Sequence, residues 1–156
     1  MNLFEYQGKR LYQEFSIPTP KSTFVSSISE ISDNHGLIYP VVVKAQVQVG
    51  GRGKAGGIKV AKDFDELAKF SGEILGMEIK GHIVESLLLE EASNILEEYY
   101  ISFTLDRSAK SYLMMLSAKG GMDIEEVAEK NPDDLIMLHI SPSKGLDSET
   151  ILKSIE

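Results

Sequence analysis

Residues 41–60 constrain the fold and chemistry of this 156-residue chain more than any other stretch. They read VVVKAQVQVGGRGKAGGIKV: a β-branched run with one lysine, a glycine-rich loop and a second apolar-alternating run. The run 41–47, which follows Pro40, predicts a strand buried on both faces, and residues 58–62 predict a strand with one wet face. The stretch therefore predicts two strands joined by a glycine-rich, cationic loop.

The loop formally matches the pattern G-x-G-x-x-G over residues 51–56. A dinucleotide-binding fold needs a helix after that pattern, with its N-terminus at the pyrophosphate. Here Gly57 leads into an alternating strand, which disfavours a Rossmann site. A Walker A loop is disfavoured as well, because Gln48 stands where its first glycine belongs and Ala55 replaces the metal-binding Ser or Thr.

A glycine-rich hairpin that folds over a triphosphate remains, as in protein kinases. Glycines let the backbone approach phosphate oxygens closely, and Arg52 and Lys54 add positive charge. Lys44, one strand earlier, would place a further cation beside the phosphates. Two alternatives stay open from the residues alone: the loop cations are only solvated, or Lys44 extends to solvent or pairs with a carboxylate.

Apolar spacing and capping signals predict the remaining elements. Asn2 with Glu5 is expected to cap a first helix that stops before Pro18, and the last helix is still running at Glu156. The chain is therefore expected to be cut inside an element. Further helices are expected from Ser27 to Gly36, Phe64 to Leu75, Asp123 to Lys130 and from Asp147, and strands at 23–25, 83–92, 99–105, 112–117 and 135–140, with a hairpin turn at 106–110.

Composition narrows the partners of the chain. Its net charge is −8, from 24 acidic and 16 basic residues, which argues against binding to a nucleic-acid backbone. Small anionic ligands stay possible, because they need only a local cluster of cations. The chain has no cysteine, no apolar run near the roughly 18 residues of a membrane span and no signal-peptide core in residues 1–13, so we expect no membrane association and a cytoplasmic location.

Carboxylates follow the predicted strand 83–92. Glu90, Glu91 and Glu98 lie at or after its end, where carboxylates could accept hydrogen bonds from an adenine amino group or from ribose hydroxyls. The alternative is a solvated acidic edge.

Two other residue types carry weaker signals. The histidines lack metal-ligand spacing, so we expect surface or core positions for His35, His82 and His139. No basic field surrounds the aromatic residues at strand spacing, so Tyr99, Tyr100 and Phe103 are expected in a core rather than in a stacking platform.

Several segments, in order along essentially the whole chain, resemble the β subunit of ADP-forming succinate–CoA ligase. They are residues 1–9 (MNLFEYQGK), 42–60, 89–91, 98–100, 106–108 and 120–125 (GGMDIE). The sequence Lys-Ala-Gln followed by GGRGKAGG is highly specific as a set. Two departures stand out: Gln48-Val49 replaces His-Ala of many members, and 76–86 is shorter than in many bacterial members and resembles archaeal-type β subunits.

The resemblance implies an α+β ATP-grasp fold, incomplete over residues 1–156, with mixed or antiparallel sheets and flanking helices. Two subdomains would hold ATP between them: residues 21–92 with the glycine-rich hairpin, and residues 1–20 together with 93–156. The implied nucleotide contacts are Lys44, Gly51, Arg52 and Gly53 on the phosphates, and Glu90, the backbone near Ser93, and Glu98 on the adenosine. For the glutamates, this replaces the solvated-edge alternative.

The family's reaction converts ATP, succinate and CoA into ADP, phosphate and succinyl-CoA through succinyl phosphate and a phosphohistidine, a step of the tricarboxylic acid cycle. The resemblance implies an α-subunit partner, in a heterodimer or heterotetramer, that carries this histidine and the CoA site. The Mg²⁺ ligands, an Asn and an Asp, would lie beyond the point that matches Glu156, so no catalytic residue is expected here and the chain alone is expected to be inactive. Its role would be to orient ATP and neutralise its phosphates. The alternatives are the β subunit of a related acyl-CoA ligase, such as malate–CoA ligase, and a non-catalytic nucleotide-binding or partner-docking module.

Overall fold

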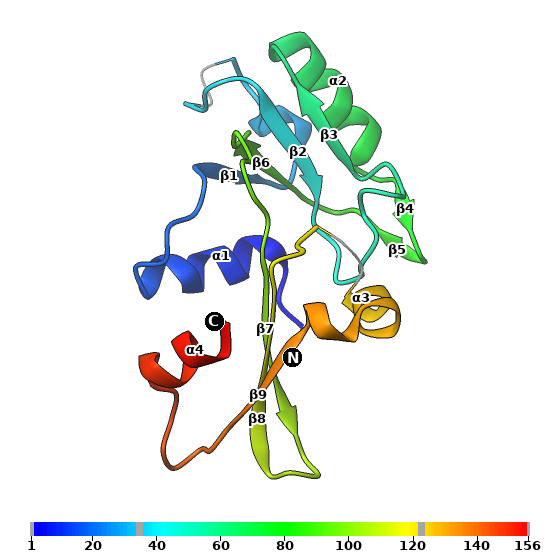
Figure 1. Cartoon of the computed structure of the whole chain (residues 1–156). Coiled ribbons are helices and arrows are strands. Elements are labelled where there is room, and N and C mark those ends of the chain that lie inside the picture. Colours follow the sequence, from blue (N-terminus) through cyan, green and yellow to red (C-terminus); the bar gives the residue numbers. More distant parts are fainter. Residues whose placement is uncertain (1, 34–35, 122–123, 156) are drawn as a thin grey trace. The chain divides into compact units, whose positions relative to one another are not determined.

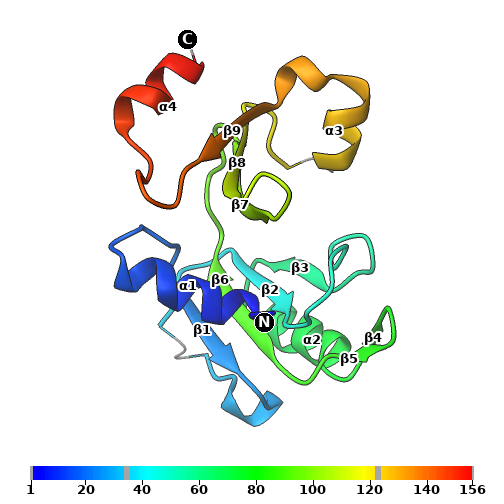
Figure 2. The same ribbon diagram turned by 90° about the horizontal axis from the view of Figure 1, so that it is seen from below.

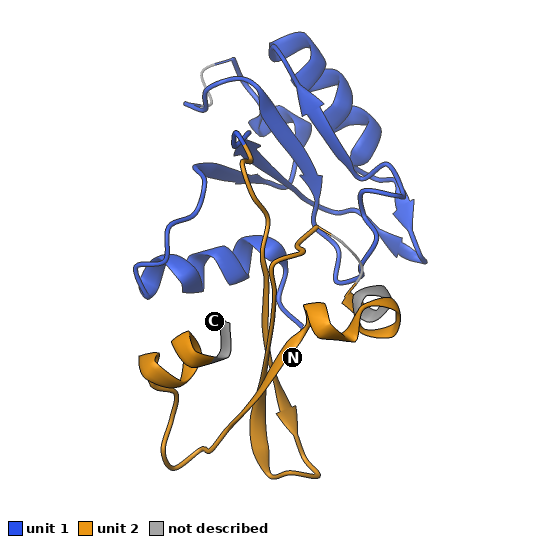
Figure 3. Ribbon diagram, viewed as in Figure 1, with its two compact units in different colours: residues 1–94 blue, residues 95–156 orange. Residues whose placement is uncertain are grey.

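A computed structural model describes residues 2–33, 36–121 and 124–155 (Figure 1). Contacts divide the chain into two compact units, Met1–Asn94 (unit 1) and Ile95–Glu156 (unit 2), which Figure 3 shows in different colours. Unit 1 contains α1 (Glu5–Glu14), β1 (Ser22–Val25), η1 (Ile28–Glu30), β2 (Val41–Ala45), β3 (Ile58–Ala61), α2 (Phe64–Ile74), β4 (Glu78–Ile79), β5 (His82–Ile83) and β6 (Leu87–Glu91). Unit 2 contains β7 (Tyr100–Asp106), β8 (Ser111–Ser117), α3 (Ile124–Lys130), η2 (Pro132–Asp134), β9 (Ile136–Ile140) and α4 (Ser148–Ile155).

Unit 1 is built on an antiparallel four-stranded sheet of order β1-β6-β2-β3. Side chains alternate between the two faces of a strand. Val41 and Val43 of β2 therefore share the face that packs on α2, and Lys44 lies on the opposite face, where it meets α1. The prediction that this strand is buried on both faces holds in part: every second residue of β2 is fully buried, and the residues between them, on the face that α1 covers, are only partly buried.

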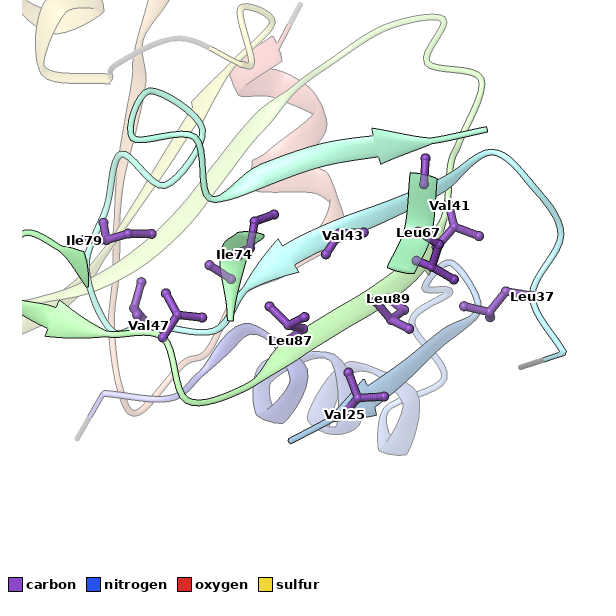
Figure 4. Packing of buried hydrophobic residues seen from close by; sticks show 13 residues of the cluster. Val25, Leu37, Val41, Val43, Val47, Leu67, Ile74, Ile79, Leu87 and Leu89 are labelled. Carbon is purple, nitrogen blue, oxygen red and sulfur yellow. The ribbon is translucent and has the colours of Figure 1, made fainter. Parts of the chain in front are cut away.

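The apolar core of unit 1 lies between the sheet and α2 (Figure 4). Leu87 and Leu89 of β6 converge there with Leu67 and Ile74 of α2, and all four side chains are 0% exposed. Full burial of one such side chain contributes about 1.5–3 kcal/mol. This layer therefore fixes the positions of β2 and β6, which carry residues on the opposite face as well.

The helix α1 lies on the other face of the sheet. Its Tyr6 ring packs on Phe24 of β1, with ring centroids 4.4 Å apart. The Tyr6 backbone N–H donates to Gln46 Oε1 at 3.1 Å, just beyond the end of β2. The contacts thus place α1 in unit 1. We expected residues 1–20 to form one subdomain together with residues 93–156. The division of the complete fold into subdomains stays a prediction.

Local capping signals predicted some helix starts correctly. Asp63 caps α2 by accepting from the Glu66 N–H at 2.9 Å, as expected. Asp147 likewise accepts from the Thr150 N–H at 2.8 Å before α4. The expected cap Asp123 lies outside the described residues. None of the described helices is long and apolar enough to cross a membrane.

Two other helix predictions are wrong in part. The first helix is capped at Phe4, whose N–H donates to Gln7 Oε1 at 2.9 Å, and not at Asn2. The second expected helix does begin at Ser27, which caps it by accepting from the Ser29 N–H at 3.3 Å, but it is only the short turn η1 and does not reach Gly36. The later start of α1 leaves Glu5 in its first turn, free to contact the sheet.

Unit 2 contains the predicted hairpin β7-β8, extended by β9 into an antiparallel three-stranded sheet. In Figures 1 and 2, α3 and α4 lie on either side of this sheet. The expected core positions of Tyr99 and Phe103 are wrong, because their side chains are 68% and 56% exposed. β7 is an edge strand, so its side chains have strand neighbours on one side only.

Candidate functional site

Five charged side chains meet on the α1-covered face of the unit 1 sheet, and we call them the charge cluster. They are Glu5 and Lys9 of α1, Lys44 of β2, Glu90 of β6 and Arg52 of the glycine-rich loop. All five side chains are largely buried, at 6% to 22% exposure. Three cations against two carboxylates leave the cluster with one formal positive charge.

Lys44 is the centre of the charge cluster. Its Nζ lies 2.6 Å from Glu90 Oε1 and 3.1 Å from Glu5 Oε1. In the sheet, Val42 lies opposite Glu90, so Lys44 reaches the carboxylate diagonally from the neighbouring strand. In this structure Lys44 therefore pairs with carboxylates, which was one of the two alternatives for this residue. The two ion pairs hold its ammonium group in place near the glycine-rich loop.

The glycine-rich loop brings a second cation to the same place. Arg52 Nη1 lies 2.8 Å from Glu5 Oε2 and donates to the Ala45 carbonyl oxygen at 2.9 Å. The loop is compact: the Gly57 N–H donates to the Arg52 carbonyl at 2.8 Å, and the Gly57 carbonyl accepts from the Ala45 N–H at 2.8 Å. Gly51 has φ +83°, which only glycine adopts without strain.

Cations from a strand and from a glycine-rich loop are suited to bind a polyphosphate. Comparisons with known proteins identify the family of this chain. The sequence matches the model of the ATP-grasp domain over residues 2–156. The chain belongs to the ATP-grasp family. This confirms the expected α+β fold with antiparallel sheets and flanking helices.

Relatives narrow the resemblance further. The β subunit of ADP-forming succinate–CoA ligase from Halobacterium salinarum is 46% identical over 149 residues, which is 95% of this chain and 39% of that protein. This ATP-grasp chain thus spans about two fifths of the length of that relative.

Solved structures support the fold. Dinucleotide forming acetyl-coenzyme A synthetase 1 from Ca. Korarchaeum cryptofilum matches 99% of this chain and 65% of its own, with a TM-score of 0.77 at 22% identity. ATP citrate lyase from Methanothrix soehngenii matches 94% of this chain and 36% of its own, with a TM-score of 0.68 at 22% identity.

The ATP-grasp chain brings together only some of the expected site residues. Lys44, Arg52 and Glu90 meet in the charge cluster, and Gly51 and Gly53 flank Arg52 in the loop with exposed backbone positions. The other two expected contacts, Ser93 and Glu98, are exposed; Ser93 follows β6 in unit 1, and Glu98 belongs to unit 2, where its carbonyl accepts from the Gly120 N–H at 2.9 Å.

Sequence reasoning missed Glu5 and Lys9. Their i,i+4 spacing does place them on one face of α1, where Lys9 Nζ lies 3.4 Å from Glu5 Oε1. Lys9 also pairs with Glu90. Opposite charges one helical turn apart are common on solvated helix faces, so the spacing alone did not indicate a contact with β2 and β6.

The charge cluster shifts the titration of its members. Burial alone would raise the pKa of the Glu5 carboxyl, but Lys44 and Arg52 outweigh burial and hold this pKa below its ordinary value. Burial lowers the pKa of the Lys9 ammonium, and repulsion from Lys44 lowers it further. Attraction to Glu5 raises this pKa and offsets part of the shift. Glu5 is therefore ionised at neutral pH.

Unit 1 should lose stability in acid through Glu5. A carboxyl whose pKa is depressed on folding stabilises the fold above its unfolded pKa, and this contribution is lost as the pH falls through the folded pKa. The ordinary pKa of a glutamate carboxyl is 4.5. We expect the free energy of unfolding to decline as the pH falls below this value. Urea unfolding of the wild type and of Glu5→Gln across the acid range checks this, since their difference isolates Glu5 from other carboxyls. Parallel pH profiles would contradict the expectation.

The described residues do not suit a magnesium site. Among them, no three His, Cys, Asp or Glu side chains gather in a way that could hold a metal ion. Both carboxylates of the charge cluster are engaged by cations. The donor set therefore suits an anionic ligand rather than a divalent cation.

Proposed function

We propose that this chain is the ATP-binding part of the β subunit of ADP-forming succinate–CoA ligase. The observation that carries the proposal is the convergence of Lys44 from β2 and Arg52 from the glycine-rich loop on the same carboxylate, that of Glu5. The 46% identity to the Halobacterium salinarum β subunit supports the choice of ligase. The complete enzyme would convert ATP, succinate and CoA into ADP, phosphate and succinyl-CoA, by way of a phosphohistidine on the α subunit.

In this proposal the chain positions the nucleotide and neutralises its charge. Lys44 and Arg52 would contact phosphate oxygens, and the backbone at Gly51 and Gly53 would approach them closely, because glycine has no side chain to interfere. Glu90 fixes Lys44 at 2.6 Å, and its carboxylate has further lone pairs with which it could accept from the adenosine. Ser93 and Glu98 would supply the remaining adenosine contacts.

The cofactor and the partner follow from the same proposal. ATP would be bound with Mg²⁺, whose ligands we expect outside the described residues. An α subunit would supply the phosphorylated histidine and the CoA site. The complete enzyme would work in the cytoplasm. A related acyl-CoA ligase is the second candidate, because the structural neighbours include an acetyl-coenzyme A synthetase and an ATP citrate lyase.

Removal of the Lys44 charge tests nucleotide binding. Isothermal titration of the purified chain with ATP and Mg²⁺ should show binding, and Lys44→Ala should weaken it by about tenfold or more, since loss of one charge-assisted contact costs about 1.5–3 kcal/mol. Lys62→Ala removes an exposed lysine of the same unit and should leave the affinity unchanged. Absence of binding, or equal affinities of wild type and Lys44→Ala, would refute the phosphate site.

A further inference from the structure

The Glu5 carboxylate takes the place that an anionic ligand of Lys44 and Arg52 would take. Its Oε1 lies 3.1 Å from Lys44 Nζ, and its Oε2 lies 2.8 Å from Arg52 Nη1. One oxygen therefore faces each cation, which is how two oxygens of a phosphate group engage a pair of basic side chains. The carboxylate bridges the strand cation and the loop cation.

The position of Glu5 favours negative charge for a second reason. Glu5 is the first residue of the ten-residue helix α1, where the helix dipole stabilises an anion. Its Oε2 is buried, yet no donor is aligned with it for a hydrogen bond among the described residues. The surroundings of the Glu5 carboxylate are thus electropositive and largely buried, and the hydrogen-bonding capacity of its Oε2 is not fully used.

Neither cation depends on Glu5 alone for its position. Lys44 keeps Glu90 at 2.6 Å, and Arg52 keeps the Ala45 carbonyl at 2.9 Å. Both backbone segments are also anchored, because β2 lies inside the sheet and the loop closes through Gly57. Loss of the Glu5 charge would therefore leave the two cations in place and raise the formal charge of the cluster from one to two.

On the basis of the phosphate-binding function proposed above, we propose that Glu5 is an internal competitor for the phosphate subsite between Lys44 and Arg52. Its carboxylate bridges the two cations, as the structure shows, and yields them to an incoming polyphosphate. Glu5 thereby lowers the affinity for polyphosphate below what the cations alone would give, which favours release of the nucleotide product. Lys9 pairs with Glu90 in this structure, so Glu90 does not have to move when Glu5 yields the cations.

Inorganic pyrophosphate is the probe, because it carries the phosphate chemistry without a base or ribose. Isothermal titration should give a Kd for Glu5→Gln that is tighter than that of the wild type by about tenfold, since one repulsive charge at contact distance is removed. Glu14→Gln makes the same change of net charge at an exposed position of the same helix and should leave the Kd unchanged.

The outcomes separate this proposal from the proposed function. If the wild type binds pyrophosphate and Lys44→Ala weakens it, but Glu5→Gln binds equally or more weakly with an unchanged circular dichroism spectrum, the competitor role is wrong and the phosphate site stands. If neither the wild type nor Glu5→Gln binds, both fail.

Binding by Glu5→Gln alone would support both proposals. If Glu5→Gln does not fold, Glu5→Ala replaces it: this variant lacks both the charge and the bridge, and it should also bind more tightly than the wild type. Equal or weaker binding by a folded Glu5→Ala would then overturn the competitor role.

Discussion

Replacement of Glu90 by alanine is expected to destabilise unit 1 by about 2–4 kcal/mol, because it removes one side of a buried ion pair. The Glu90 residue is only 5% exposed, and its carboxylate pairs with both Lys44 and Lys9. Without it, two largely buried ammonium groups share the single carboxylate of Glu5, which Arg52 also engages. The cluster would then hold three cations and one anion in a poorly solvated place.

Urea unfolding of the wild type and Glu90→Ala measures this loss. Glu85→Ala is the matched control, since it deletes an exposed carboxylate two residues before β6 begins and should not move the midpoint. Glu90→Gln keeps the shape of the side chain and should fall between the wild type and Glu90→Ala, because its amide oxygen can still accept from one lysine. Similar midpoints for Glu90→Ala and Glu85→Ala would show that the buried pairs contribute nothing to stability.

The cluster also shows where sequence reasoning stops. The strand–loop–strand of residues 41–60 could be predicted, because β-branched runs and glycines act locally. Asp63 with Glu66 was equally predictable as a helix start, since its signal lies within four residues. Glu5 and Lys9 reach partners 39 and 81 positions away along the chain, and no local pattern encodes such a distance.

Two further features were missed for different reasons. The hairpin of β4 and β5 has strands of two residues each, too short for an alternating pattern, and only the positive φ of Lys80 and Gly81 marks its turn. Glu90 ends an apolar run, which looks like the wet end of a strand. Its burial depends on α1 covering that end, and this packing is a property of the tertiary fold.

Gly57→Ala should destabilise unit 1 by about 1–3 kcal/mol, the cost of overpacking a well-filled core. A Cβ on Gly57 would lie 2.6 Å from Ile79 Cδ1 and 3.1 Å from Ala45 Cβ. Neither neighbour can move aside freely, because both side chains are buried, at 1% and 0% exposure. The strain should therefore move the backbone at Gly57 itself, at the point where the glycine-rich loop closes.

This displacement couples the core to the phosphate site. The Gly57 N–H donates to the Arg52 carbonyl at 2.8 Å, so a shift of Gly57 should pull Arg52 away from the Ala45 carbonyl and from Glu5. Urea unfolding should give Gly57→Ala a lower midpoint, and pyrophosphate titration should give it a weaker affinity than the wild type. Gly53→Ala is the control for stability, because a Cβ there meets nothing within 4 Å and its midpoint should stay unchanged. Equal midpoints for the two alanine variants would mean that the loop can rearrange at Gly57 without loss of stability. The contact of Gly57 with the core would then not hold Arg52 in place.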